Sequence, residues 1–240
     1  MKKQKNGEKM IYVMSDIHGC YEKYKKMLEK ISLSKEDTLY ILGDVTDRGP
    51  NGMKVLLDIA KHDNISLFWG NHDRQAAILL SNLYNLDEKN CPKELVKVYE
   101  SWFLDGGRET LAEYLSLSDE EQKTVLNVLK NSITAKEIEV NGKTFLLAHT
   151  VPEADRICDY EEWTLEDYIL GEPDYEEVYF EDKYIVTGHT PTGYIDRKSM
   201  GKIWMGNRHI AIDCGAVFGN PLGCLCLDTL EEFYINIKEK

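Results

Sequence analysis

Residues that can bind a metal or a phosphate follow one short apolar stretch after another along this chain. These residues are Asp16/His18, Asp44/Asp47/Arg48, Asn71/His72, His149 and His189. Each apolar stretch has the length of a buried strand. In an open α/β sheet, the loops beyond the carboxyl ends of the strands meet at one crevice. We therefore expect these residues to lie at a single site, although they are far apart in the sequence.

The first part of the chain alternates between strand and helix patterns. Strands are predicted at Met10–Ser15, Thr38–Leu42 and Ile65–Trp69, and helical spacing of apolar residues occupies Tyr21–Ile31 and Met53–Ala60. Three strands alternating with helices are typical of a parallel βαβ sheet.

The rest of the chain predicts helices and then strands. The expected helices are Lys93–Trp102, Arg108–Leu115 and Asp119–Asn131, the last with Ser118 and Glu121 as a capping box. The expected strands are Ile138–Val140 and Thr144–Ala148 as a hairpin, Lys183–Thr187, and an antiparallel tail at Ile203–Met205, His209–Asp213, Gly223–Leu227 and Phe233–Ile237. We predict one domain over residues 1–240, with a helical insertion at 85–132 and an acidic excursion at 151–182.

The chemistry of the candidate site favours divalent metals. Carboxylates, an amide oxygen and imidazoles suit Mn(II), Fe(II) or Zn(II), and the set is too large for a single ion. It fits two ions about 3.5–4 Å apart that share one carboxylate, polarise a phosphoryl group and ionise a water. Glycines at 19, 43, 70 and 188 would let the backbone turn sharply beside such ions.

Several motifs resemble those of the calcineurin-like metallophosphoesterases, and more narrowly the bacterial and phage phosphoprotein phosphatases. These motifs are DIHGC at 16–20, GDVTDRG at 43–49, GNHD at 70–73, His149 in LLAHT, His189 in TGHTP, and WFLDGGRETL at 102–111. The resemblance implies a four-layer α/β/β/α sandwich with a helical insertion and a two-metal site.

The resemblance also implies a role for each site residue. Asp16 and His18 would bind the first metal, Asp44 would bridge both, and Asn71, His149 and His189 would hold the second. His72 would protonate the leaving oxygen, Asp47 would orient that imidazole, and Arg48 would bind phosphoryl oxygens. Two ions are expected, with manganese first and iron, zinc or nickel as alternatives. A metal-bridging hydroxide would attack phosphorus directly, without a covalent enzyme intermediate.

The substrate is less constrained than the chemistry. The main expectation is a phosphoserine/phosphothreonine protein phosphatase; the alternative is a symmetrical diadenosine tetraphosphate hydrolase, which GNHD resembles more closely than RGNHE. Trp69 replaces the arginine of RGNHE, either as a core aromatic or as a surface on which substrate stacks. Arg108 and Arg156 are candidates for a second phosphate-binding arginine. A nucleic-acid phosphodiesterase and an inactive scaffold remain as weaker alternatives.

Charge and composition exclude other classes. The net charge is −13, and residues 151–182 hold thirteen acids and one base, so a general nucleic-acid binder is disfavoured. The chain lacks an apolar run of membrane-spanning length and a secretory leader pattern, so we expect a cytoplasmic protein acting on phosphoproteins or small phosphoesters. The six cysteines are expected to be buried reduced thiols. His62 and His209 are expected to be surface or strand histidines.

Overall fold

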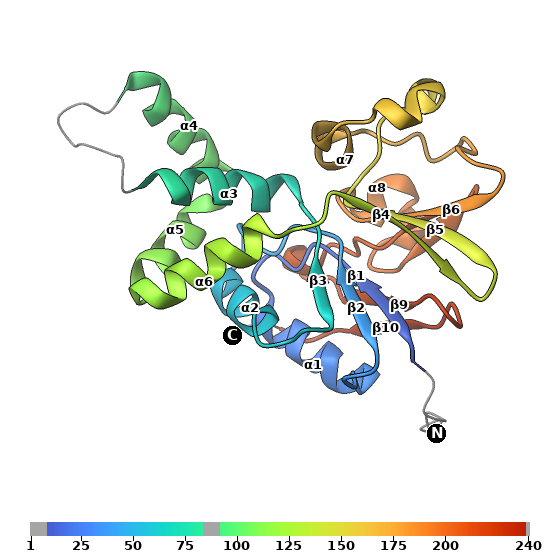
Figure 1. Ribbon diagram of the computed structural model, residues 1–240, viewed down its shortest axis with the longest axis horizontal. Helices are drawn as coiled ribbons and strands as arrows, with labels where there is room; N and C mark the ends of the chain where they lie inside the picture. The colour runs from blue at the N-terminus through green and yellow to red at the C-terminus, as the bar shows by residue number, and fades with distance from the viewer. Residues whose placement is uncertain (1–8, 84–91, 239–240) are drawn as a thin grey trace.

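Two five-stranded sheets form the centre of the molecule in the computed structural model, which describes residues 9–83 and 92–238 (Figure 1). The first sheet, in the order β10-β9-β1-β2-β3, contains β1 (Ile11–Met14), β2 (Thr38–Ile41), β3 (Ile65–Leu67), β9 (Leu222–Cys226) and β10 (Glu232–Ile235). The second, in the order β4-β5-β6-β8-β7, contains β4 (Ala135–Val140), β5 (Lys143–Ala148), β6 (Lys183–Thr187), β7 (Trp204–Gly206) and β8 (His209–Ala211).

Strand pairing confirms the predicted parallel sheet and corrects the predicted tail. Strands β1, β2 and β3 are parallel, with Val13 opposite Tyr40. The tail strands do form two antiparallel pairs, β7 with β8 and β9 with β10. However, the two pairs belong to different sheets, and β8 also runs parallel to β6. Both sheets are mixed. In the first, β9 runs antiparallel to β1; in the second, β5, β6 and β8 are parallel, and the edge strands β4 and β7 run antiparallel to their neighbours.

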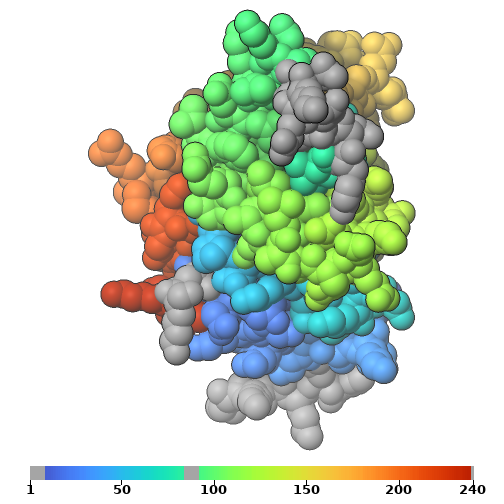
Figure 2. Space-filling model, turned by 90° about the vertical axis from the view of Figure 1, so that its left-hand side faces the viewer, coloured from blue at the N-terminus to red at the C-terminus, as the bar shows by residue number. Residues whose placement is uncertain are grey.

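Several helices lie on the outer side of the first sheet. They are α1 (Tyr21–Ile31), α2 (Gly52–Ile59), α3 (Asn71–Asn82), α4 (Lys93–Leu104), α5 (Gly107–Ser116) and α6 (Asp119–Lys130). Helices α1 and α2 pack on the strands, whereas α5 and α6 pack on α2 and α3, and α4 packs on α5. The capping box of Ser118 and Glu121 at the start of α6 is confirmed. In the space-filling view of this side, the green atoms of α4–α6 lie above the blue atoms of α1 and α2 (Figure 2). Residues 85–91 of the predicted insertion lie outside the described residues.

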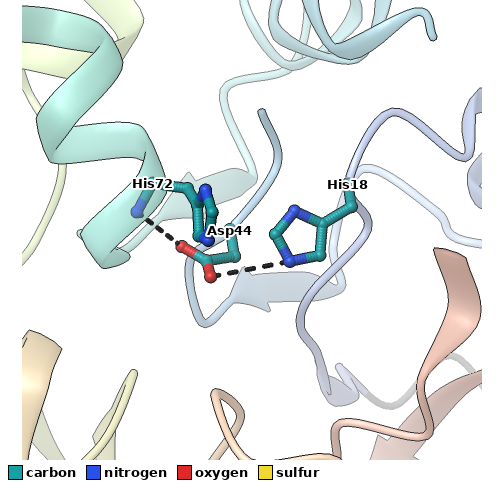
Figure 3. Close-up of side chains that lie close together, drawn as sticks. All are labelled: His18, Asp44 and His72. Carbon is teal, nitrogen blue, oxygen red and sulfur yellow. Dashed lines mark hydrogen bonds and ion pairs between the residues drawn. The ribbon is translucent and has the colours of Figure 1, made fainter. Parts of the chain in front are cut away.

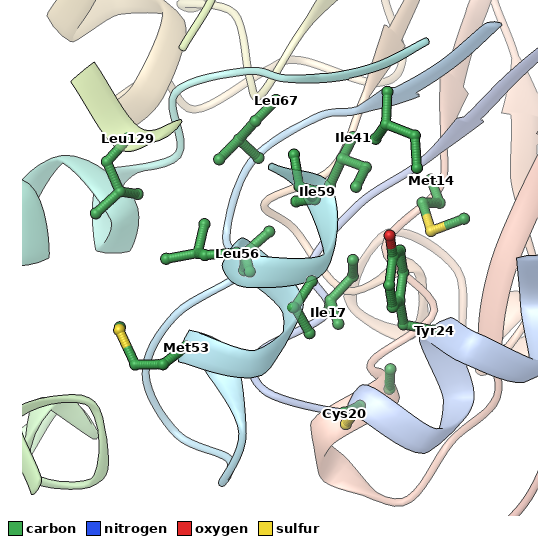
Figure 4. Packing of buried hydrophobic residues seen from close by; sticks show 14 of the residues in the cluster. Met14, Ile17, Cys20, Tyr24, Ile41, Met53, Leu56, Ile59, Leu67 and Leu129 are labelled. Atoms are coloured by element: carbon green, nitrogen blue, oxygen red, sulfur yellow. The ribbon is translucent and has the colours of Figure 1, made fainter. Parts of the chain in front are cut away.

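The period-2 alternation of the strands divides the core into layers. In β1, Tyr12 and Met14 pack against the helices, whereas Val13 points into the layer between the sheets. The helical layer joins residues from distant segments, including Met14, Leu56 and Leu129 (Figure 4). Because one core holds both strands and insertion helices, the ends of β1, β2 and β3 have fixed positions relative to α4–α6.

The acidic segment between β5 and β6 covers the outer face of the second sheet. It contains the 3₁₀ helix η2 (Ala154–Glu162) and α7 (Leu165–Leu170). Trp163, Tyr168 and Tyr179 from this segment pack against Leu146 and Ile185. The segment therefore buries these three aromatic side chains while exposing most of its acids, and the predicted four-layer α/β/β/α arrangement is confirmed. The remaining short helices are α8 (Thr192–Ile195), η3 (Arg197–Ser199) and η4 (Ala216–Phe218).

The cysteines mostly follow the prediction of buried reduced thiols. Cys20, Cys214, Cys224 and Cys226 are buried and free, and Cys91 lies outside the described residues. The prediction is wrong for Cys158, which is exposed because it lies in the short helix η2, none of whose residues is buried. Within residues 9–83 and 92–238, no helix combines the length and apolar character that a membrane crossing requires.

Candidate active site

The structure brings the predicted site residues together at the carboxyl ends of strands from both sheets. Asp16 and His18 follow β1, Asp44 follows β2, and Asn71 and His72 open α3 after β3. His149 and His189 follow β5 and β6 in the other sheet. The site therefore lies where the ends of the two sheets meet, as strand-end loops of an α/β fold dictate.

Left-handed backbone conformations direct many of these side chains. Among the predicted site residues, φ lies between 43° and 67° for Asp16, His18, Asp44, Asp47, Arg48 and His189. This conformation is uncommon for residues with a Cβ atom and clusters at functional sites. Because it turns the chain sharply after each strand, it allows two or three side chains of one loop to reach the same place.

The Asp44 carboxylate is the centre of the cluster. Its Oδ2 lies 3.6 Å from Nε2 of His18 and 3.5 Å from Nε2 of His149. Its Oδ1 accepts a hydrogen bond of 3.1 Å from the backbone N–H of His72, in the first turn of α3 (Figure 3). Asp44 belongs to both groups of potential metal ligands, one with His18 and His72 and the other with His149 and His189. No other described residue belongs to both groups.

Gly70 makes the contact between α3 and Asp44 possible. A Cβ atom at position 70 would lie 2.1 Å from Oδ1 of Asp44. Only glycine allows the amino end of α3, with its partial positive charge, to approach the carboxylate this closely.

His149 is oriented as a metal ligand is oriented in proteins. Its Nδ1–H donates to the carbonyl oxygen of Leu42 at 2.7 Å, which directs Nε2 into the site. Nε2 lies 3.1 Å from Oδ1 of Asn71 and 3.1 Å from Nδ1 of His189. His18 has the same arrangement, since its Nδ1–H donates to the carbonyl of Thr46 at 2.7 Å.

The donor set fits divalent cations. Nε2 of His149, Oδ1 of Asn71 and Oδ2 of Asp44 are all acceptors, and acceptors that converge without a donor need a proton or a cation between them. Burial lowers the pKa of His149, but the charge of Asp44 outweighs it and raises the pKa to about 10. Burial acts to raise the pKa of Asp44, yet the imidazoles, above all His149, hold it well below the usual carboxyl range. Positive charge is thus favoured at the position where a metal would bind.

His72 differs from the other histidines in its hydrogen bonds. Its Nδ1 donates to Oδ2 of Asp47 at 2.8 Å, and its Nε2 is buried with no hydrogen-bond partner among the described residues. The nearest carboxylate oxygen to Nε2 is Oδ2 of Asp105, at 3.7 Å. Burial lowers the pKa of His72, but Asp44 and Asp47 together raise it above the usual histidine value. This geometry suits a proton donor, although distance alone would also allow a metal ligand.

Three supporting groups were not assigned a role from the sequence. Trp102 Nε1–H donates to Oδ2 of Asp47 at 2.8 Å, and Thr110 Oγ1–H donates to Oδ1 at 2.6 Å. Both residues lie in the segment WFLDGGRETL, which carried part of the family resemblance but suggested no role for either side chain. Asp73 accepts hydrogen bonds from the backbone N–H of Val45 and Thr46, both at 3.0 Å. The last residue of GNHD therefore fixes the loop after β2 rather than facing the site.

The arginines occupy different environments. Arg48 Nη1 lies 2.9 Å from Nε2 of His18, and Nη2 donates to Oδ1 of Asp105 at 3.3 Å. Arg108 lies over the ring of Phe103, and Arg156 pairs with Asp167. Among the described residues, neither Arg108 nor Arg156 forms a hydrogen bond or ion pair with a metal-ligand candidate, so of these three arginines the geometry favours Arg48 for phosphate.

Comparison with known proteins agrees with this geometry. Residues 9–193 match the calcineurin-like phosphoesterase family. The chain belongs to that family. This phosphoesterase is 31% identical to the asymmetrical bis(5'-nucleosyl)-tetraphosphatase PrpE of Bacillus subtilis, over 88% of this chain and 87% of the relative. It is also 36% identical to a symmetrical bis(5'-nucleosyl)-tetraphosphatase of Wigglesworthia glossinidia brevipalpis, over 38% and 36% of the two chains.

A solved structure shows the same fold. A protein serine/threonine phosphatase from Saccharomyces cerevisiae superposes with a TM-score of 0.65 at 14% identity, covering 98% of this phosphoesterase and 82% of that chain. The family, the fold and the hydrolase class predicted from the sequence are therefore confirmed, and the family's use of divalent metals agrees with the donor set. At such low identity, the yeast enzyme supports the fold alone.

Proposed function

We propose that this phosphoesterase hydrolyses bis(5'-nucleosyl) tetraphosphates. The observation behind the proposal is the full-length similarity to a tetraphosphatase, at 31% identity over 88% of the chain. This reverses the order of the two substrates expected from the sequence, where the protein phosphatase came first. It also leaves both cleavage positions open, because relatives of the asymmetrical and the symmetrical kind both match.

The proposed metal ligands are Asp16, His18, Asp44, Asn71, His149 and His189. Two divalent ions held there, manganese in our proposal, would polarise the phosphoryl group and lower the pKa of a water. Asp16 is buried and its Oδ2 accepts the backbone N–H of His189 at 3.0 Å, which ties the loops after β1 and β6 together.

The remaining steps are assigned to His72, Asp47 and Arg48. His72 holds a proton at Nε2 and passes it to the leaving oxygen, while Asp47 keeps Nδ1 protonated and the ring in place. Arg48 donates hydrogen bonds to the phosphoryl oxygens, because its guanidinium lies at the edge of the cluster.

A substrate panel with Mn(II) tests the proposal. Diadenosine tetraphosphate, a phosphopeptide, a bis-aryl phosphate and para-nitrophenyl phosphate are compared by kcat/KM. We expect the tetraphosphate to have the highest value, and product analysis separates the cleavage positions: AMP and ATP for asymmetrical, two ADP for symmetrical. A phosphopeptide turned over far faster than the tetraphosphate would overturn the proposal.

The variant Asp44→Asn tests the proposed metal site. Loss of the shared carboxylate charge should lower the metal content and reduce turnover of every substrate to near background. Metal analysis and activity are measured together on the variant and the parent protein. Full activity in the variant, or in metal-stripped protein, would contradict the two-metal proposal.

A protein phosphatase activity is the second candidate, and one observation favours it. Residues 151–182, with thirteen acids and one base, begin beside His149 and end at the strand that leads to His189. A negative surface there would attract basic phosphopeptides and repel polyphosphates.

A further inference from the structure

An exposed aromatic ring lies beside the candidate phosphate-binding arginine. Phe218 ends η4, and 63% of its surface is exposed. The guanidinium carbon of Arg48 lies 5.8 Å from the centre of its ring. Because Arg48 also contacts His18, only one side chain separates this ring from the candidate metal ligands.

The backbone beneath the ring is held firmly. The ammonium group of Lys23, a buried residue of α1, donates to the carbonyl oxygens of Ala216 at 2.6 Å and Asn220 at 3.0 Å. Asp213 accepts the backbone N–H of Gly215 at 2.7 Å. Single exposed apolar side chains are common on proteins. Here, however, the buried ammonium group of Lys23 fixes the loop backbone, while the ring of Phe218 stays exposed to solvent. The ring is therefore held in place and remains accessible to a ligand.

Arg48 connects this ring to the reacting groups. Its Nη1 occupies the side of His18 on which a cation would bind, and a guanidinium and a cation cannot share that nitrogen. When His18 binds a cation, Arg48 can keep its contacts with Asp105 and Phe218. The guanidinium then lies between the metal ligands and the ring, where it can hold a phosphate whose nucleoside extends over Phe218.

We propose that Phe218, together with Arg48, forms a base-stacking subsite for one nucleoside 5'-phosphate unit of the substrate. This inference rests on the proposed tetraphosphatase function. A flat aromatic ring stacks on any base, so the subsite binds nucleotides without selecting adenine over guanine.

Two variants and a matched control test the subsite. Phe218→Ala removes the ring, Phe218→Trp keeps a stacking surface, and Leu115→Ala alters a side chain of α5 that is also 63% exposed. The readout is kcat/KM for diadenosine tetraphosphate divided by kcat/KM for phosphoserine, a phosphomonoester without a ring. We expect Phe218→Ala to lower this ratio about tenfold or more, mainly through KM, and Phe218→Trp and Leu115→Ala to keep it. An unchanged ratio in Phe218→Ala would overturn the proposal.

Binding of AMP separates this proposal from the proposed function. If the parent protein does not hydrolyse the tetraphosphate, the proposed function is wrong. The Kd of AMP for the metal-loaded protein then tests the subsite independently. A Kd at least about tenfold weaker in Phe218→Ala than in Leu115→Ala supports the subsite, and equal values overturn it. Equal Kd values for GMP and AMP are expected as well, since stacking does not read the base edge.

Discussion

One nitrogen of His72 is occupied and the other faces the site without a hydrogen-bond partner among the described residues. The same ring belongs, by distance, to a group of potential ligands with His18 and Asp44. Structure alone therefore allows two roles for this residue, which a comparison of substrates distinguishes.

The variant His72→Asn should retain both metals and lose about 10²–10⁴-fold in rate on substrates with poor leaving groups. An activated aryl ester should lose much less, because its leaving oxygen needs no proton. Metal content and kcat for the two kinds of substrate are the measurements. An equal loss on both would exclude His72 as the acid, and loss of metal would make it a ligand.

His209 lies outside the site, and its burial predicts that stability depends on pH. Its Nε2 lies 2.8 Å from Oγ1 of Thr187, its Nδ1 has no partner among the described residues, and burial lowers its pKa to about 3. In the unfolded chain its pKa is about 6.5. Between these values the unfolded chain binds a proton that the folded chain does not, so stability falls as pH decreases from 6.5 towards 3 and is unaffected above 6.5.

The variant His209→Gln should remove this contribution. The difference in unfolding free energy between pH 7.5 and pH 5.5 should be about 1.4 kcal/mol smaller in the variant than in the parent protein. Urea unfolding at the two pH values measures it. An identical pH dependence in both proteins would show that His209 is not protonated on unfolding in this range.

Residues at the corner between α4 and α5 hold Asp47, which in turn orients His72, the proposed general acid. Thr110 both donates to Asp47 Oδ1 and accepts the backbone N–H of Asp47 at 2.9 Å. Asp105 and Gly106 form the turn, and a Cβ at Gly107, the first residue of α5, would lie 2.2 Å from the ring of Trp102. The two helices thus clamp the carboxylate that orients His72.

Thr110→Val should therefore impair turnover without removing metal. Loss of a hydrogen bond to a charged group typically costs about 1.5–3 kcal/mol, so we expect kcat to fall by about 10- to 100-fold on poor leaving groups. Thr110→Ser, which keeps the hydroxyl, should recover most of the rate, and metal content should not change. If Thr110→Ser is as impaired as Thr110→Val, packing rather than the hydrogen bond explains the loss.

The elements that the sequence predicted best are those with a clear apolar pattern and a clear end. Helix α1 and strand β6 have the predicted bounds, because the buried Tyr24, Met27 and Ile31 of α1 repeat at helical spacing and β6 is a short apolar run followed by a glycine. The strand partners of the tail were missed, because alternation along a strand does not reveal which strand lies beside it. Thus β8 pairs antiparallel with β7, as expected of the tail, but its other neighbour is β6, to which it lies parallel.

The site was predictable only in part, because local sequence patterns do not reveal contacts between distant segments. Position after a strand indicated which residues meet, and Asp44 and His149 do meet. The left-handed conformations of Asp44 and Asp47 could not be predicted, since residues other than glycine rarely adopt them and no local sequence rule requires them here. The contact of Trp102 with Asp47 also joins segments distant in the chain, and no short-range pattern signals it.

At the scale of the whole molecule, we propose that residues 1–240 act as one domain. The insertion supports this, because Trp102 and Leu129 share a core with Met14 of the first sheet. Tryptophan fluorescence and circular dichroism should report one common unfolding transition. Two separate transitions would contradict the proposal.

The uneven charge of the molecule predicts how salt affects its two candidate substrates. The segment 151–182 has a net charge of −12 and packs on the second sheet. Its Glu166 lies 3.8 Å from Arg74 on α3, the helix that begins with Asn71 and His72. Salt at 0.1 M screens such a field over about 10 Å. Raising the salt concentration should therefore increase kcat/KM for the polyanionic tetraphosphate and decrease it for a lysine-rich phosphopeptide.

Replacement of exposed acids in segment 151–182 tests whether this segment causes the salt effect. Glu161, Glu162, Glu176 and Glu177 are changed together to glutamine, and the matched control changes the exposed Glu94, Glu100, Glu120 and Glu139 in the same way. Both variants gain four units of charge, so only the position of the charge differs between them. The first should lose most of the salt dependence for both substrates, while the control should keep it, because exposed charges beyond a screening length have little effect. Equal effects of the two variants would mean that the overall charge, rather than the acidic segment, repels the tetraphosphate.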